Sequence, residues 1–441
     1  MFGGNKEVSV MGNRLRRALF SSILSIVILG AATIATALQI DSGLSLSERP
    51  DDRAFQNAMA LLIKGQIDQA DQAFQEIIRS NPKHVYAFLG RAEIALRRNK
   101  VAEGEKAVQE ALSINPKAPE AHNMMGLVRL YQKKPAEAKA AFQEAIALNP
   151  RFTTPRMYLA TLYRSENKPE LAIREYKSVI ETSPTLFTAY RGLAEVSIAT
   201  GAYDQGIETL KKWKERDPKN PDASNALGEA YLSHKDYEKA LHAFDEALRL
   251  NPKYIFATKN KGDLYSLKGE PQKAIEFYQA VLAQDPKYLE AHLRLGTIYM
   301  QLNQPQKALA AFRGAITAAP DFPMAYNNVA YLLTQEGKDL DEATRLAKKA
   351  ISLNPQYPDA YDTLGWIYLS KGNYDEAVQA LKKAKSLGGD QPEVLAHLGT
   401  AYYKRGMKKE ALPELKKAIA LKSDLPDAEA IRKMIAEIEK K

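Results

Sequence analysis

The stretch Pro221–Tyr254, PDASNALGEAYLSHKDYEKALHAFDEALRLNPKY, is a unit of 34 residues that the rest of the chain repeats. Gly228 and Tyr231 fall on one helical face, and Ala240 and Phe244 fall on another after a polar turn. Residues three or four positions apart share a side of a helix, so each half predicts an amphipathic helix. The small residues allow the two backbones to approach closely, and the rings fill the space beside them. The unit is therefore predicted to be a helix hairpin.

Prolines mark the end of almost every unit. Proline lacks a backbone donor and restrains the residue before it, so it ends a helix. The closing prolines, at intervals of 34, are Pro82, Pro116, Pro150, Pro184, Pro218, Pro252, Pro286 and Pro320, and Pro355 follows one residue late. Eleven units cover residues 51–425 and begin at residues 51, 85, 119, 153, 187, 221, 255, 289, 323, 358 and 392. One hairpin of this size cannot bury its apolar face, so the units are predicted to stack.

The eighth position of every unit is Ala or Gly. The eleven residues are Ala58, Ala92, Gly126, Ala160, Ala194, Gly228, Gly262, Gly296, Ala330, Gly365 and Gly399. Small residues at the eighth and twentieth positions, an aromatic at the eleventh and a proline at the thirty-second resemble the tetratricopeptide repeat. The resemblance implies an all-α, right-handed superhelical solenoid of helix hairpins that binds other proteins.

The two ends of the chain lie outside the repeats. Residues 1–17 are polar and basic, residues 18–40 carry no charge, and residues 41–50 form a polar linker. As a helix, 23 residues span about 34 Å, enough for a hydrocarbon core of about 30 Å. Two interpretations stay open: an uncleaved transmembrane signal anchor, or a signal peptide cleaved after Ala37. Residues 426–441 are predicted to be a capping helix.

The distribution of charge predicts where the repeats lie. The basic residues before the apolar run are expected to stay in the cytoplasm, which places the repeats outside it, in the periplasm of a Gram-negative cell. The net charge is +9 and the pI is 9.2, but the excess is spread along the chain beside nearly as many acids. Nucleic-acid binders usually concentrate their basic residues on one face, so no nucleic-acid partner is expected.

The chemistry-bearing residues form no catalytic motif. The chain has no cysteine, which excludes disulfides, thiolate zinc sites and a cysteine nucleophile. The glycines follow the repeat and do not form a phosphate-binding loop, and the six histidines have no metal-ligand spacing. We expect no enzyme activity, cofactor, metal or small-molecule substrate.

The resemblance implies a concave groove lined by positions two, five, nine, twelve and thirteen of each first helix. An apolar groove of this kind takes an amphipathic helix or an extended peptide. The alternative is that several of these residues pack against neighbouring helices. The predicted groove residues are Phe55, Met59, Leu62, Ile63, Leu89, Leu127, Leu130, Tyr131, Arg191, Asn225, Lys259, Asn327, Tyr331, Trp366 and Tyr403.

Paired lysines recur on the second helices of the last three repeats. They occupy matched positions and are expected to form a basic ladder on the convex surface, for an acidic partner or as a solvated face. The ladder consists of Lys348, Lys349, Lys382, Lys383, Lys416 and Lys417.

These features predict a membrane-tethered scaffold that assembles partner proteins outside the cytoplasm. An accessory subunit of an envelope polysaccharide or glycosyl-transfer system is an alternative by analogy of fold. A cytosolic co-chaperone is disfavoured, because that variant of the family grips a carboxylate with Lys and Asn at fixed positions. Here Lys259 is followed by Asp263 where the asparagine belongs.

Overall fold

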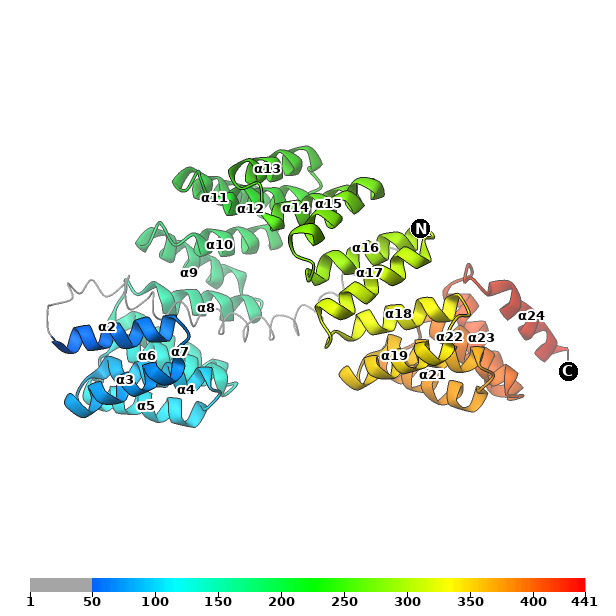
Figure 1. Ribbon diagram of the computed structural model, residues 1–441, viewed down its shortest axis with the longest axis horizontal. Helices are drawn as coiled ribbons and strands as arrows, with labels where there is room; N and C mark the ends of the chain where they lie inside the picture. The colour runs from blue at the N-terminus through cyan, green and yellow to red at the C-terminus, as the bar shows by residue number, and fades with distance from the viewer. Residues whose placement is uncertain (1–49, 441) are drawn as a thin grey trace. The chain divides into compact units, whose positions relative to one another are not determined.

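The structure, a computed structural model, describes residues 50–440. Within this range the chain forms 23 α-helices and no strand (Figure 1). The all-α prediction is therefore confirmed for the part of the chain that the structure describes. The predicted segments 1–17 and 18–40, and the linker 41–50 apart from Pro50, lie outside the described residues.

The described chain divides into two compact units, the first ending at His234 and the second beginning at Lys235. Each repeat supplies a first helix, which has an even label, and a second helix, which has an odd label. The first unit contains α2 (Pro50–Ile63), α3 (Ile67–Ser80), α4 (Val85–Arg97), α5 (Val101–Ile114), α6 (Pro119–Tyr131), α7 (Pro135–Leu148), α8 (Thr153–Ser165), α9 (Pro169–Thr182), α10 (Phe187–Ala199), α11 (Tyr203–Arg216) and α12 (Pro221–Ser233). The second unit contains α13 (Tyr237–Leu250), α14 (Ile255–Leu267), α15 (Pro271–Gln284), α16 (Leu289–Gln301), α17 (Pro305–Ala318), α18 (Pro323–Gln335), α19 (Leu340–Leu353), α20 (Pro358–Ser370), α21 (Tyr374–Gly388), α22 (Pro392–Lys404), α23 (Lys408–Leu421) and the final helix α24 (Ala428–Glu439).

The turn inside a repeat depends on one residue with a left-handed backbone. Gly65 holds this position between α2 and α3 with φ +76°, and Asn99 holds it between α4 and α5 with φ +56°. Glycine has no Cβ to clash in this region, and asparagine tolerates it better than most residues. The conformation reverses the chain within a few residues, so the two helices of a repeat pack side by side.

In several repeats a side chain at the fourth position of the first helix holds the turn that precedes it. His122 Nε2 lies 2.8 Å from the carbonyl oxygen of Pro116, and the Tyr326 hydroxyl donates to the carbonyl of Pro320 at 2.9 Å. The closing proline therefore ends one helix and also supplies the acceptor that fixes the next one. This contact gives the fourth-position histidine a structural role.

In several hairpins the core contains a large side chain packed against a glycine. A Cβ added at Gly296 in α16 would lie 2.4 Å from the Phe312 ring of α17, and one at Gly126 would lie 2.4 Å from Phe142. Atoms at that separation overlap, so only glycine allows this approach of the helices. The close helix contact predicted from the eighth position is present at both of these glycines.

In two repeats the glycine lies on the other side of the ring. In the repeat that contains Tyr176, the eighth position is Ala160 and not glycine. The glycine that packs against the Tyr176 ring is Gly192 of the following first helix, where an added Cβ would lie 2.5 Å from the ring. Phe74 is placed in the same way against Gly90, also at 2.5 Å. An aromatic ring at this site thus packs against a glycine. The glycine is supplied either by the first helix of the same repeat or by the first helix of the next repeat.

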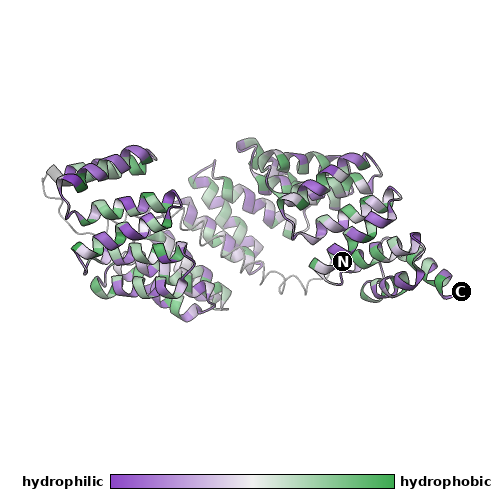
Figure 2. Ribbon diagram, turned by 90° about the horizontal axis from the view of Figure 1, so that it is seen from below, coloured by the Kyte–Doolittle hydropathy of each residue, from purple (hydrophilic) through white to green (hydrophobic). Residues whose placement is uncertain are grey.

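Figure 2 shows hydrophobic and hydrophilic residues interleaved along the helices. The final helix α24 is amphipathic in this way, with Ile431 only 1% exposed against the last hairpin. Met434, Ile435 and Ile438 also pack against that cluster. Across residues 50–440 no helix combines the length and the apolar character that a bilayer crossing requires.

Candidate protein-binding surface

In the first unit, core packing accounts for half of the predicted apolar groove residues. Met59, Leu62, Leu89 and Leu127 are buried, Phe55, Leu130 and Tyr131 are half-buried, and Ile63 is 59% exposed. The buried members belong to hydrophobic clusters within this unit. They therefore offer no apolar surface to a partner, and only the other four stay candidates for binding.

The two predicted polar groove residues of the first unit, Arg191 and Asn225, share one partner, Glu229. Arg191 in α10 lies 3.5 Å from the carboxylate of Glu229 in α12, and its guanidinium lies 5.8 Å from the centre of the Trp213 ring. The Asn225 amide donates to the other oxygen of Glu229 at 3.0 Å. These contacts link the first helices of neighbouring repeats across their surface.

Glu93 in α4 is a buried carboxylate that the sequence analysis did not single out. It is 3% exposed, and Arg97 Nε donates to its Oε1 at 3.0 Å. Its Oε2 has no hydrogen-bond partner among the described residues. Burial raises the pKa of Glu93, and the neighbouring Arg97 offsets this only in part. The sequence does contain one indication of this residue: Glu93 is the ninth residue of its repeat, and the ninth position lines the predicted groove in other repeats.

At the start of the second unit, Lys259 belongs to a charged network across three helices. Its Nζ lies 3.1 Å from Asp263, and Asp263 also accepts from the Tyr278 hydroxyl at 2.6 Å. Arg294 in α16 approaches the same carboxylate at 3.5 Å. Burial, and then the Asp263 carboxylate, raise the pKa of Tyr278. The network ties α14, α15 and α16 together.

Large exposed hydrophobic side chains concentrate on the first helices. Of the seven among the described residues, six lie at second, ninth, twelfth or thirteenth positions of first helices. They are Ile63, Phe256, Leu267, Met300, Met324 and Tyr331, and the seventh is Leu421 in α23. Five of the six lie in α14, α16 and α18, which are successive first helices of the second unit. The sequence analysis named only Ile63 and Tyr331, although the same register points to the other four.

Three aromatic rings on successive first helices form what we call the aromatic row. Tyr331 in α18, Trp366 in α20 and His397 in α22 lie with ring centres 5.3 Å and 5.6 Å apart. The Trp366 and His397 rings are nearly parallel, at 9°, while the Tyr331 ring is tilted by 53°. Such offset and tilted pairs are favourable arrangements for aromatic groups. The structure thus brings two predicted groove residues together with one histidine that the sequence analysis did not place there.

Carboxylates flank the aromatic row. His397 Nδ1 lies 2.9 Å from Asp362 Oδ1, and Glu393 pairs with Lys422 at 2.7 Å. Burial lowers the pKa of His397, but Asp362, with Glu393 and Asp427 further away, outweighs it and raises the pKa. Burial also raises the pKa of Tyr331, and the charges of Asp362 and Glu393 add to this. The charges of Asp362 and Glu393 therefore influence the pKa values of both Tyr331 and His397.

The two remaining predicted groove residues of the second unit differ in environment. Asn327 in α18 is 6% exposed, and its Oδ1 has no hydrogen-bond partner within residues 50–440. Tyr403 in α22 donates its hydroxyl to Glu437 in the final helix. Tyr403 thus contacts the final helix α24, whereas the side-chain oxygen of Asn327 is an acceptor without a donor among the described residues.

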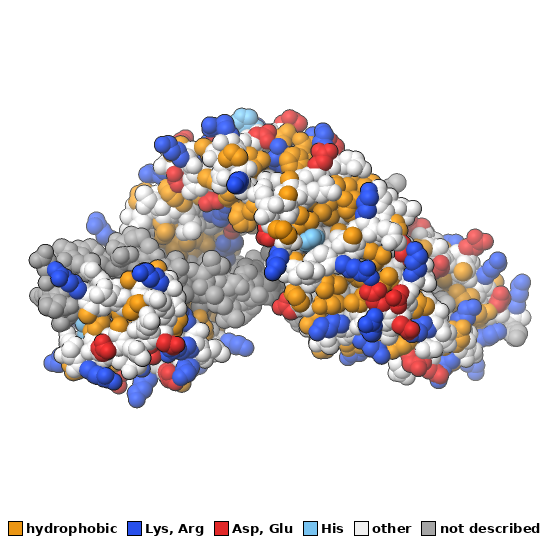
Figure 3. Space-filling model, in the orientation of Figure 1, with side chains coloured by type: hydrophobic (Ala, Val, Ile, Leu, Met, Phe, Trp, Pro, Cys, Tyr) orange, Lys and Arg blue, Asp and Glu red, His pale blue; other side chains and the backbone are white. Residues whose placement is uncertain are grey.

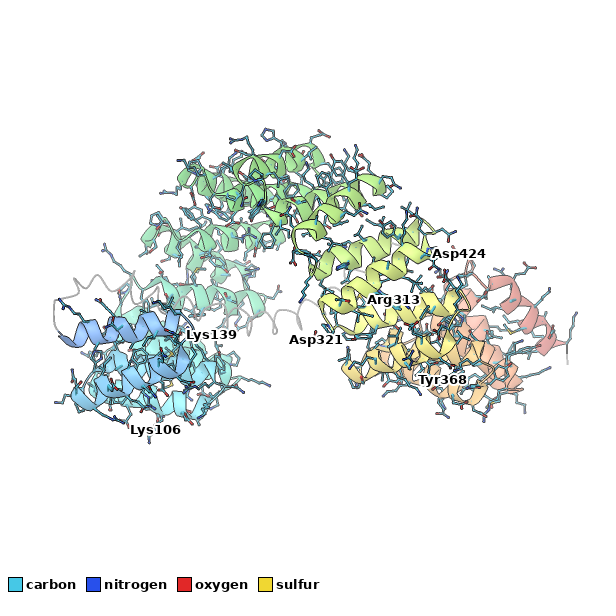
Figure 4. All side chains as sticks on the ribbon, viewed as in Figure 1. Lys106, Lys139, Arg313, Asp321, Tyr368 and Asp424 are labelled. Atoms are coloured by element: carbon cyan, nitrogen blue, oxygen red, sulfur yellow. The ribbon has the colours of Figure 1, made fainter. Side chains whose placement is uncertain are left out.

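All six lysines of the basic ladder are exposed on α19, α21 and α23. Lys416 pairs with Glu439 and Lys417 with Asp390, each at 2.6 Å. The ammonium of Lys348 lies 6.0 Å from the centre of the Tyr368 ring, which Figure 4 labels. Two of the six charges are therefore compensated locally, which weakens the ladder at its C-terminal end.

A separate surface cavity of about 380 Å³ lies between α3, α4 and α5. Its charged lining is mixed: Arg98 pairs with Asp71 at 2.9 Å, and Lys106, labelled in Figure 4, lines the cavity together with Glu103 and Glu110 of the same helix. Its cations and carboxylates are present in equal number, so the cavity does not select a ligand by charge. No group of three metal-ligating side chains occurs among the described residues.

The fold and this surface define a class of protein built from stacked helix hairpins. Tetratricopeptide-repeat models match residues 55–119, 119–152, 163–230 and 221–254. The model described as the cilia and flagella-associated protein 70 C-terminal domain matches residues 254–441. The chain is a tetratricopeptide-repeat protein.

Several solved structures have similar folds, and each of those given below matches half of this chain or less. MamA protein is 30% identical, with 38% of this chain and 90% of that chain covered and a TM-score of 0.34. YrrB, titled a TPR protein with an unusual peptide-binding site, is 25% identical, covering 43% of this chain and 97% of that one with a TM-score of 0.37. Pseudomonas aeruginosa pilF is 20% identical, covering 50% and 99%, with a TM-score of 0.42. No curated protein matches the chain. None of these similarities bears on what this chain binds.

Proposed function

We propose that this chain is a protein-binding scaffold that holds segments of other proteins on the surface of its first helices. One observation supports the proposal most strongly: six of the seven large exposed hydrophobic side chains in the described part of the chain lie on first helices. Random surface placement would distribute them over both helices of the hairpin. Exposed apolar groups gathered on one surface are typical of interaction sites.

Affinity capture with surface variants tests the scaffold function. Met300→Ser with Met324→Ser removes two exposed apolar groups from α16 and α18, while Leu421→Ser removes one from a second helix. We expect the first variant to lose partner proteins that the wild-type chain captures from solubilised membranes, as measured by quantitative mass spectrometry. Leu421→Ser should retain them. An identical set of captured proteins for all three chains contradicts the proposal.

The scaffold is also proposed to be tethered to a membrane through residues 18–40, with its repeats on the extracytoplasmic side. The uncharged run and the basic residues before it support this, and both lie outside the described residues. Protease treatment of intact spheroplasts tests the placement: digestion of the repeats there indicates that they are accessible outside the inner membrane, and protection until lysis contradicts it. Mass measurement of the mature N-terminus distinguishes an anchor from cleavage after Ala37.

A further inference from the structure

The first helices of the last three repeats carry few charges, and most of them are negative. α18 has none, α20 has Asp359 and Asp362, and α22 has Glu393 with Lys404 at its end. The second helices of the same repeats carry the basic ladder instead. Since the whole chain has a net charge of +9, this negative surface runs against its overall composition.

The same three first helices carry hydrogen-bond acceptors and aromatic rings. Asn327 Oδ1 in α18 is buried and has no partner among the described residues, and Asp362 follows at the same position of the next first helix. Tyr331 is 36% exposed, and Met324, seven residues earlier on the same helix, is 39% exposed. Where Figure 1 draws α18 with the second helices α19 and α21, Figure 3 shows hydrophobic side chains interleaved with charged ones.

We propose that the surface formed by α18, α20 and α22 binds a basic segment of a partner protein, in which Lys or Arg side chains alternate with apolar ones. This inference rests on the proposed scaffold function and specifies the chemistry of its partner. A cationic side chain is attracted to the faces of tryptophan and tyrosine rings, and a guanidinium can stack on a ring while it donates to a carboxylate. Trp366 and Tyr331 supply the rings, and Asp362 supplies the carboxylate.

The size of the surface limits the length of the segment. α18 contacts α20, and α20 contacts α22. Packed helices lie about 8–10 Å apart, so three of them extend over about 20 Å. An extended chain rises about 3.3 Å per residue, so about six residues cross the surface. A short linear segment is therefore sufficient.

The tryptophans of the chain provide a direct measurement. There are two, and Trp213 lies in the first unit, 4% exposed. The Trp213→Phe variant leaves Trp366 as the sole tryptophan, so its emission reports on the proposed surface. The probes are two synthetic peptides of about 12 residues, one alternating Lys with Leu and the other alternating Glu with Leu. Calorimetry on the same samples gives an independent Kd.

We expect the basic peptide to shift the Trp366 emission saturably, and added salt to weaken its binding. The acidic peptide should give no shift. Asp362→Asn with Glu393→Gln in the same background should weaken binding of the basic peptide by about tenfold or more. The matched control, Glu376→Gln with Glu410→Gln, removes the same charge from exposed sites on α21 and α23 and should leave the Kd unchanged.

Equal binding of both peptides, binding of neither, or an equal effect of both carboxylate pairs would overturn the inference. If the first pair lowers the thermal stability, Glu393→Gln alone is used, because that carboxylate is exposed. Preference for the acidic peptide overturns the charge assignment but leaves the scaffold function standing. Failure of the scaffold function appears separately, as unchanged partner capture by the Met300→Ser, Met324→Ser variant.

Discussion

The two compact units use the same repeat register to build different first-helix surfaces. In the first unit, apolar residues at groove positions, such as Leu62 and Leu89, lie in the core at no more than 2% exposure. In the second unit, Met300 and Met324 occupy groove positions and are 36% and 39% exposed. The register thus determines which side of a helix a residue is on. Whether the residue is buried depends on how closely the next first helix packs over it.

The largest expected effect tests this contrast in burial. Leu89→Ala should lower the free energy of unfolding by about 2–5 kcal/mol, because it leaves a cavity in the core. Met300→Ala removes a partly exposed side chain and should change it by no more than about 0.5 kcal/mol. Urea denaturation monitored by circular dichroism measures both. Equal losses would show that the two units do not differ in this way.

The next effect tests the close helix contact within a hairpin of the second unit. Gly296→Leu places a side chain where a Cβ alone would lie 2.4 Å from Phe312, so we expect a loss of about 1–3 kcal/mol. Ala310→Leu adds the same side chain at an exposed site of the same hairpin and serves as the control. Thermal melts of both variants check this, and an unchanged melt for Gly296→Leu would mean that the helix contact is looser than described.

A smaller effect concerns the first unit, where the glycine opposite Tyr176 lies in the next repeat. Gly192→Ala gains helix propensity of about 1 kcal/mol but places a Cβ 2.5 Å from the ring, so we expect a net loss of about 1 kcal/mol. Ala160→Gly makes room on the other side of that ring. The double variant should therefore lose at least about 0.5 kcal/mol less than the two single losses combined. A double-mutant cycle by urea denaturation measures this coupling, and strict additivity contradicts it.

Much of the fold follows from local sequence. Closing prolines such as Pro252 end helices by steric rules, and small eighth-position residues such as Gly296 indicate where helices cross. Gly192 lies outside that pattern, because the ring it accommodates belongs to the preceding repeat. Its role depends on packing between repeats, which no single hairpin encodes.

The candidate surface is less predictable than the fold for the same reason. Leu62 and Met300 are both apolar residues at the twelfth position of their repeats, yet one is fully buried and the other is not. His397 and Asp362 are 35 residues apart, and they meet only because α20 and α22 pack together. Repeat position identifies candidates, but exposure and pairing are decided by neighbouring repeats.

The smallest expected effect lies in the second unit, at His397. Asp362 outweighs the opposing effect of burial and raises the pKa of this histidine in the folded chain. A raised pKa means that the fold binds the proton more tightly than the unfolded chain does. This contribution to stability is therefore complete below about pH 6.5 and is lost as the pH rises through the folded-state pKa.

Asp362→Asn leaves burial as the main influence, so the His397 pKa should fall below its ordinary value and the contribution should change sign. Histidine NMR titration measures the pKa, and thermal melts between about pH 5 and 9 measure the stability. Glu376→Gln, an exposed carboxylate of α21, should leave both unchanged. A His397 that titrates at the same pH in Asp362→Asn as in the wild-type chain would show that the electrostatic environment of the aromatic row is not set by this pair.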